Sequence, residues 1–183
     1  MIKKLPTLAL VVFSGIACCK TPGVDNFQAL SEKTCVPLSA SSVKHTLPNE
    51  WQPYLSSSKV CPLIKTPGAK SAIVLISVSL EDATRNKSPG DAWDKLPKPI
   101  FFNEKGQCVA RLPYLFPDDP PFGIQLSYGQ WQGLIPGEIR LHVQNQAVEG
   151  DFDLPTLTWN TKIQSYVPVG EFAGKEKELM RCP

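Results

Sequence analysis

The sequence predicts an all-β protein: an antiparallel β-sandwich, immunoglobulin-like or of a similar Greek-key type, with short helical turns. Apolar and polar residues alternate at period two in several short runs, as in strands with one buried face, and β-branched and aromatic residues fill these runs. The 18 prolines fall mainly between the runs, where they act as turn and edge residues. A small β-barrel is the alternative arrangement of the same strands.

The first elements follow in chain order. Residues 20–33 are mostly polar and open with a turn sequence, so we expect a tether there. In residues 72–80 every second residue is apolar, and the residues between them are apolar only at the start of the run. A strand with apolar residues on both faces is buried on both sides, so we predict a central strand here. Residues 100–103 and 107–112 flank a glycine-containing turn and predict a hairpin, in which the parity of the second strand points Cys108 toward the core.

The second half of the chain shows the clearest alternation. Residues 122–128 and 138–144 each predict a strand with one buried and one solvent-exposed face. Residues 157–169 continue period two on both sides of an Asn-Thr turn and predict a last hairpin. Residues 89–95 and 175–180 are expected to form short helical turns.

The N-terminal segment and the length define the expected organisation. Two lysines precede an uncharged, mostly apolar run that ends at Ala17, which is the layout of a secretory signal peptide. A helix of about 13 residues covers about 20 Å, less than the roughly 30 Å hydrocarbon core of a bilayer. The remaining residues suit one domain. We predict a signal peptide over 1–17, a tether over 18–33 and a single β-sandwich domain over 34–183.

The end of this leader resembles the lipobox of bacterial lipoproteins, in which a cysteine becomes the acylated first residue of the mature chain. The matching segments are residues 15–18, ending in Cys18, and residues 16–19, ending in Cys19. The resemblance implies a lipid anchor on Cys18, with Cys19 as the alternative. Because no Asp follows either cysteine, it also implies the outer membrane, facing the periplasm. The other interpretation is an ordinary signal peptide cut after Ala17.

Charge excludes two classes of partner. Removing residues 1–17 takes away two of the 19 basic residues and none of the 17 acidic ones, so the mature chain is close to neutral. A nucleic-acid partner requires a clustered positive surface, and so does a polybasic membrane contact. We therefore expect no nucleic-acid partner, and membrane attachment through acyl chains.

Four cysteines remain in the exported body: Cys35, Cys61, Cys108 and Cys182. In an oxidising compartment they are expected to form two disulfides, with three possible connectivities. The preferred pairing is Cys35–Cys61 with Cys108–Cys182, because the second bridge would hold the charged C-terminal tail. Free buried thiols and a metal site are the alternatives, and the absence of a C-x-x-C pair argues against the metal.

No pattern in the sequence indicates catalysis, a resident metal or a cofactor, so we expect a protein that is not an enzyme. The chain has two histidines. His142 lies on the polar parity of a strand and His45 in a polar stretch, and both are expected to be exposed and without a catalytic partner. Glu149, Asp151 and Asp153 could offer oxygen ligands to Ca²⁺, but the full EF-hand pattern is missing, and solvated loop acids are the simpler interpretation.

Loop aromatic residues are the candidates for binding. Trp131 lies between Gln residues, Trp93 in a helical turn and Trp51 in an aromatic loop, and such residues anchor protein interfaces. Trp159, in strand register, is expected in the core. The predicted function is binding of another protein in the periplasm; immunity lipoproteins and accessory lipoproteins of envelope machines share this outline of a leader plus a small β-domain. The alternatives are a glycan- or peptidoglycan-binding module that uses Trp131 and Trp93, and a secreted hydrolase.

Overall fold

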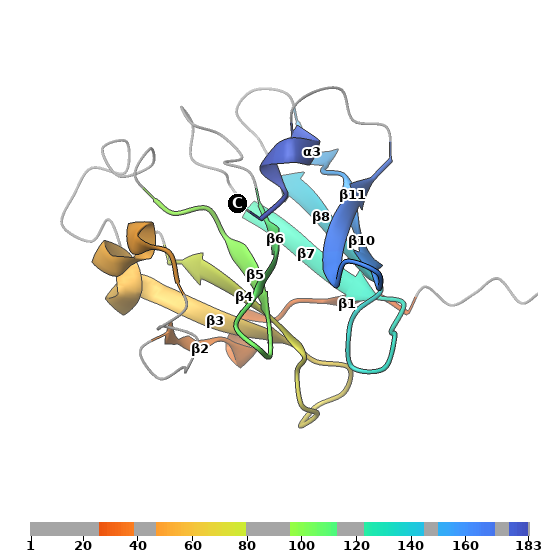
Figure 1. The fold of residues 1–183 in the computed structure, drawn as a ribbon, viewed down its shortest axis with the longest axis horizontal. Helices are drawn as coiled ribbons and strands as arrows, with labels where there is room; N and C mark the ends of the chain where they lie inside the picture. Colours follow the sequence, from red (N-terminus) through yellow and green to blue (C-terminus); the bar gives the residue numbers. More distant parts are fainter. Residues whose placement is uncertain are drawn as a thin grey trace, which may run out of the picture.

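The computed structural model describes residues 26–38, 47–79, 96–112, 123–144, 150–170 and 176–182. These residues form two antiparallel β-sheets that pack face to face (Figure 1). Neither sheet closes on itself, so the arrangement is a sandwich and not a barrel, and the predicted antiparallel β-sandwich is confirmed. The predicted leader with Cys18 and Cys19, His45 and Trp93 lie outside the described residues.

The strands of the first sheet, sheet A, are β1 (Gln28–Ala29), β7 (Gly123–Gly129), β8 (Glu138–Gln144), β9 (Phe152–Asp153), β10 (Thr156–Asn160) and β11 (Ser165–Val169). Those of sheet B are β2 (Val36–Pro37), β3 (Ser58–Leu63), β4 (Ile73–Val78), β5 (Ile100–Asn103) and β6 (Cys108–Arg111). The short helices are the 3₁₀ helices η1 (Glu32–Thr34) and η4 (Asn49–Ser57) and the α-helix α3 (Glu176–Leu179). Sheet A runs β1-β7-β8-β10-β11 with β9 beside β8, and sheet B runs β2-β3-β4-β5-β6.

The alternating runs of the sequence account for most of these strands. The run over 72–80 contains β4, at the centre of sheet B, and the later runs contain β7, β8, β10 and β11. The predicted turn between β5 and β6 is present, and Gly106 adopts φ +72° there, a conformation that favours glycine. The expected C-terminal helical turn is α3, whereas the turn expected over 89–95 lies outside the described residues.

The space between the sheets holds the main apolar core. Phe101 of β5 meets inward side chains of sheet A such as Leu126, Ile139 and Leu157, all buried. On β7, β8 and β10 the buried residues fall on alternate positions, as period two requires. Trp159 is buried among them, as its register predicts.

A second apolar cluster covers the outer face of sheet B. Ile76 of β4 packs into this outer cluster, whereas Ile73 and Leu75 face the core between the sheets, so the central strand is covered on both sides. Helix η4 supplies Trp51, which is fully buried beside Phe102. The prediction that Trp51 is a binding residue is therefore wrong. Its segment folds as a helix whose apolar side chains pack on the sheet, where the sequence suggested an exposed aromatic loop.

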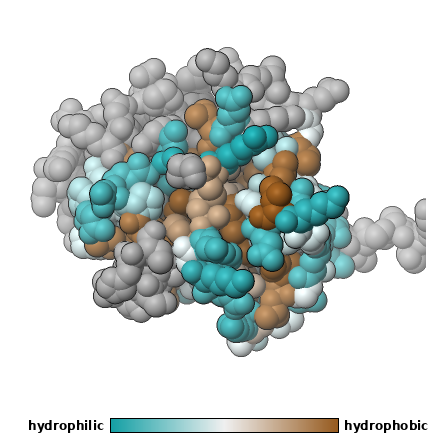
Figure 2. Space-filling model, in the orientation of Figure 1, coloured by the Kyte–Doolittle hydropathy of each residue, from teal (hydrophilic) through white to brown (hydrophobic). Residues whose placement is uncertain are grey.

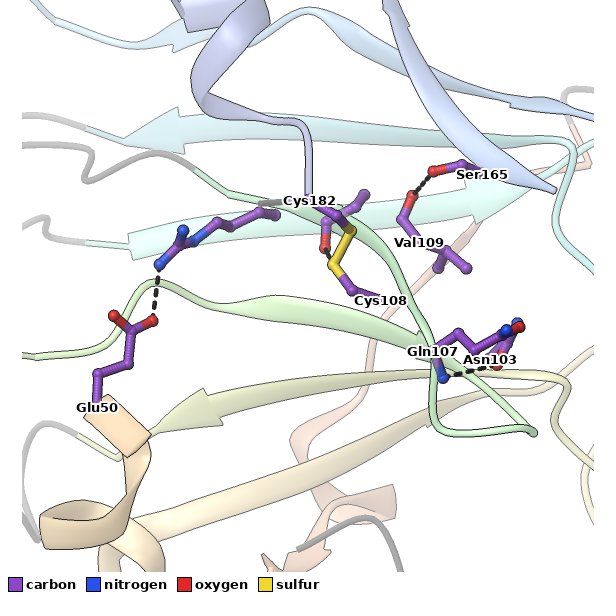
Figure 3. The surroundings of a disulfide bond; sticks show 9 residues. Glu50, Asn103, Gln107, Cys108, Val109, Ser165 and Cys182 are labelled. Atoms are coloured by element: carbon purple, nitrogen blue, oxygen red, sulfur yellow. Dashed lines mark hydrogen bonds and ion pairs between the residues drawn. A yellow bond between two sulfur atoms is a disulfide. The ribbon is translucent and has the colours of Figure 1, made fainter. Parts of the chain in front are cut away.

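Two disulfides, Cys35–Cys61 and Cys108–Cys182, cross-link the sandwich, and this is the preferred pairing. The second bridge ties the segment after α3 to β6 (Figure 3). Close to it, the Arg111 main-chain N–H donates to the Met180 carbonyl at 2.9 Å, and Met180 is fully buried in the main core. The C-terminal tail is thus held along the β6 edge of sheet B, as expected.

Cys108 itself does not face the core between the sheets, contrary to its predicted parity. It is half-buried and packs against the outer cluster of sheet B. The register between β5 and β6 shifts between Phe101 and Phe102, so a simple alternation does not carry through the hairpin.

The folded body begins earlier than predicted. Strand β1 lies inside the stretch assigned to the tether, yet Gln28 pairs with Tyr128 of β7 and the Leu30 N–H donates to the Leu126 carbonyl at 2.8 Å. The predicted boundary at residue 34 is therefore too late. This short edge strand is held by main-chain hydrogen bonds. Such bonds do not depend on apolar side chains, so a mostly polar sequence gives no sign of the strand.

Candidate functional surfaces

Four loops meet at one end of the sandwich, which we call the hairpin end: residues 64–72, 103–107, 130–137 and 160–164. They connect β3 to β4, β5 to β6, β7 to β8 and β10 to β11, and they lie in the lower part of Figure 1. A cleft of about 290 Å³ brings these loops together. The cleft is lined by Ala72, Asn103, Glu104, Lys105, Ile135, Trp159, Thr161 and Gln164.

The tip of the β7–β8 loop is a tight turn. Gln132 and Ile135 exchange two main-chain hydrogen bonds, of 2.8 and 3.1 Å. Gly133, the first residue between them, has φ +66°, as a type II′ turn requires at that position. Leu134 follows it and is left 45% exposed at the tip.

Trp131, the predicted binding residue in this loop, joins the loop to the body of the sandwich. It is half-buried, and its ring meets the Tyr128 ring edge to face at a centroid distance of 5.8 Å. The Lys65 ammonium lies 6.0 Å from the centre of the indole. The base of the loop is fixed by the buried Tyr166 hydroxyl, which donates to the Pro136 carbonyl at 2.8 Å. Burial raises the pKa of Tyr166, so this hydroxyl stays a neutral donor.

The β10–β11 and β5–β6 loops are each organised by an asparagine side chain. Asn160 Oδ1 accepts the N–H groups of Lys162 at 3.0 Å and Ile163 at 3.4 Å. Asn103 Oδ1 accepts two main-chain N–H groups of its own loop at 3.0 Å. This Asx geometry fixes the turns and leaves Ile163 at the tip, 62% exposed, the most exposed large apolar residue in the described parts of the chain.

The hairpin end is cationic. Its four loops contain Lys65, Lys70, Lys105 and Lys162, whereas Glu104 is the single acid in them. Glu104 pairs with Lys70 at 2.8 Å; their hydrogen bond and opposite charges lower the pKa of Glu104 and raise that of Lys70. Four lysines against one glutamate give the hairpin end a net charge of +3, although all 183 residues together carry a formal net charge of only +2.

The outer face of sheet A differs from that of sheet B, because no described helix or strand covers it. We call it the bare face. Since the buried residues of its strands alternate with outward ones, it consists of Gln125, Ser127, Glu138, Arg140, His142, Thr156, Thr158, Val167 and Val169. In β11 the buried positions are Tyr166 and Pro168, so Val167 and Val169, which continue the period-two run, face outward.

Arg140 lies near the middle of the bare face, on the central strand of sheet A. Its guanidinium is centred 3.6 Å from the centre of the Phe27 ring, a close cation–π stack. It also contacts Glu138 at 3.4 Å. Arg and aromatic side chains are enriched among the residues that dominate binding energy in protein interfaces. The sequence gives no signal of this pair, because only the β1–β7–β8 arrangement brings Phe27 to Arg140.

His142 binds two acids at the edge of the bare face. The imidazole Nδ1 lies 2.8 Å from Asp153 Oδ1, and Nε2 lies 3.7 Å from Asp151 Oδ2. The predicted exposed position of His142 is confirmed. The two aspartates that the sequence offered as oxygen ligands therefore contact an imidazole, and the third member of that set, Glu149, lies outside the described residues.

We expect His142 to titrate above its usual value. The hydrogen bond to Asp153 raises its pKa, and the charges of Asp153 and Asp151 add to the rise. Because the folded pKa lies above the unfolded 6.5, the pairing stabilises the fold fully below pH 6.5, and this contribution is lost as pH rises through the folded pKa. The measurement is an NMR titration of the His142 ring, whose signal is identified with His142→Gln.

Asp153→Asn serves as the variant for this titration. Removing the carboxylate should lower the pKa of His142, and high salt should reduce the remaining rise, because the groups are exposed. An unchanged pKa in Asp153→Asn would show that this ion pair is absent in solution.

Comparison with protein-family models, curated proteins and solved structures finds no match for this chain. Within the described ranges, no helix is both long and apolar enough to cross a membrane. The two disulfides are typical of proteins that fold outside the cytoplasm. They indicate an exported, extracytoplasmic protein.

Proposed function

We propose that this protein is an exported, non-enzymatic bacterial lipoprotein, anchored in the outer membrane through acylated Cys18, that binds another protein in the periplasm through the bare face. The observation that carries the proposal is the asymmetry between the two sheets. The chain covers the outer face of sheet B with η4 and a second apolar cluster, whereas none of the described helices or strands covers the outer face of sheet A, which carries the Arg140–Phe27 stack.

The composition of the bare face suits a protein interface. It combines a stacked arginine, charges of both signs in Glu138 and His142, and exposed apolar surface at Val169. Interfaces combine such anchors with a polar surround. The bare face is formed by four strands that lie about 4.8 Å apart and are about six residues long, so its surface area is about 400 Å². Since a standard interface buries about 800 Å² per partner, we expect a complex of the smaller, transient class.

Action by occlusion or scaffolding follows from this geometry. A sheet face backed by a continuous apolar core is rigid, so binding costs little ordering of the main chain. The proposal includes an immunity-type inhibitor and an envelope-machine accessory, both of which need a fixed surface outside the cytoplasm and no reactive group.

Affinity purification of the native lipidated protein tests the partner. We expect a specific protein to co-purify with the wild type, and Arg140→Ala to weaken that complex at least about tenfold, because it removes the central anchor. Arg181→Ala, an exposed arginine outside the bare face, is the matched control and should retain the partner. Unfolding curves of both variants check that the fold is intact.

Two results would contradict the proposal. Equal recovery of the partner with Arg140→Ala and Arg181→Ala would place the interface elsewhere. Recovery of a glycan and no protein would favour the second candidate function, a glycan-binding module.

One observation favours that second candidate: the cleft at the hairpin end combines the Trp159 ring with the polar side chains of Asn103 and Gln164. Retention on cell-wall or glycan resin that is lost in Gln164→Ala, a variant of the cleft lining, would support it. Trp159 is only 8% exposed, so little of its ring can stack on a sugar.

A further inference from the structure

We infer that the hairpin end lies against the lipid bilayer, with Leu134 and Ile163 inserted at the headgroup level and the loop lysines beside anionic headgroups. The inference rests on the lipid anchor of the proposed function, and it adds an orientation and a second membrane contact made by the folded body. Three independent features of the described residues support it: where the body begins, which apolar side chains are exposed, and how charge is distributed.

The folded body begins at the hairpin end. Asn26 lies against Gly129, the last residue before the β7–β8 loop, so closely that a Cβ on Gly129 would overlap the Asn26 carbonyl oxygen. In Figure 1, β1 starts on the same side of the molecule as this loop. Eight residue steps separate Cys18 from Asn26, and at no more than about 3.6 Å each they span at most about 29 Å. An acyl chain on Cys18 therefore keeps the hairpin end close to the bilayer.

The tips of two hairpin-end loops are apolar. Leu134 and Ile163 are 45% and 62% exposed, and both loops contribute to the same cleft. Figure 2 shows hydrophobic surface interleaved with hydrophilic surface over the lower right of the molecule. Trp131 lies in the same loop as Leu134. Tryptophan is enriched at membrane–water interfaces, because one end of its ring is apolar and the other end can hydrogen-bond to water.

The charge of the hairpin end matches an anionic bilayer. Lys65, Lys105 and Lys162 supply positive charge in three different loops, and the single acid, Glu104, is neutralised by Lys70. Lysines near an anionic lipid surface are attracted to its headgroups within a Debye length of about 8 Å at physiological salt. Long lysine side chains also place their ammonium groups in water beside an inserted apolar tip.

The loops need little rearrangement for this contact. The Gly133 turn and the two Asx turns already hold the tips in place through internal hydrogen bonds. With the hairpin end on the bilayer, the strands run away from the membrane and the bare face points to the side. The orientation thus presents to the periplasm the surface on which the proposed function depends.

Fluorescence quenching by brominated lipids tests the orientation. The mature lipidated protein is reconstituted into vesicles of brominated phosphatidylcholine, with or without phosphatidylglycerol, and carries Leu134→Trp or Val169→Trp. These positions are matched, since Leu134 is 45% and Val169 43% exposed, but Val169 lies on the bare face. We expect the added fluorescence of Leu134→Trp to be quenched in phosphatidylglycerol vesicles, and that of Val169→Trp to remain unquenched.

A variant of the lysines tests the charge. Lys105→Gln combined with Lys162→Gln should remove most of the quenching of Leu134→Trp in phosphatidylglycerol vesicles, as should 1 M salt, where the Debye length falls to about 3 Å. Equal quenching at both reporter positions, or none at Leu134→Trp, would overturn the inference. The mass of the mature N-terminus separates the two proposals. If neither Cys18 nor Cys19 carries an acyl group, the proposed anchor fails. If the chain is acylated but the fluorescence of Leu134→Trp is not quenched, only the proposed orientation is refuted.

Discussion

Replacing Cys108 and Cys182 together with alanine is expected to lower the free energy of unfolding by about 4.4 kcal/mol. The bridge spans 74 residues, and a cross-link of that length removes a large share of the chain entropy of the unfolded state. Its loss also frees the tail that places Met180 in the main core. Denaturant unfolding of the double variant and the wild type, with the slope compared as well as the midpoint, measures the difference.

The other disulfide supplies the control for this prediction. Cys35–Cys61 closes a shorter loop, with a separation of 26 residues, so its double alanine variant should lose about 3.5 kcal/mol by the same relation. The C-terminal bridge should therefore be the costlier one to remove. A larger loss in the Cys35/Cys61 variant would show that the tail contributes less than its burial indicates.

Trp51→Ala is expected to destabilise the fold by about 3–5 kcal/mol, the range for a fully buried large aromatic side chain. Trp51 is 0% exposed and fills the outer cluster of sheet B beside Phe102, so its removal leaves a cavity under η4. Thermal or denaturant unfolding monitored by circular dichroism gives the change.

Trp131→Ala is the matched substitution. Because Trp131 is half-buried at the edge of the main core, we expect its substitution to lower the free energy of unfolding by about 1 kcal/mol, which is typical of a partly buried position. If Trp131→Ala lowered the free energy of unfolding as much as Trp51→Ala, the two side chains would not differ in burial as the structure shows. Both residues are tryptophans in aromatic or Gln-rich segments, and the sequence suggested the same role for both.

The strands and their buried faces could be predicted because they depend on local patterns. Period two selects the buried positions of β7 and β8 directly, and the tight turn between β5 and β6 is encoded by Asn103 and Gly106. The prediction failed where a contact between distant segments decides the structure. Main-chain pairing puts β1 into sheet A, and an irregular register turns Cys108 away from the core between the sheets.

The candidate surfaces were less predictable than the fold. Trp131 was identified from its neighbours in the sequence, and it does lie at the hairpin end. The Arg140–Phe27 stack was not identified, because an arginine on the polar parity of a strand gives no local signal of its partner. Trp51 was misassigned for a related reason: an aromatic segment rich in polar residues can cover a sheet as well as project from a loop.

By itself the sequence determined the class of the fold, the number of disulfides and the expectation of an exported chain, since alternation, cysteine count and leader composition are each local or additive properties. Only the tertiary structure decided how charge and apolar surface are distributed. The formal net charge of the chain is only +2, yet antiparallel connections bring four loops to one end, where three lysines remain unbalanced beside Leu134 and Ile163. Net charge is a sum over the chain, whereas the field at a surface depends on which residues the fold places together.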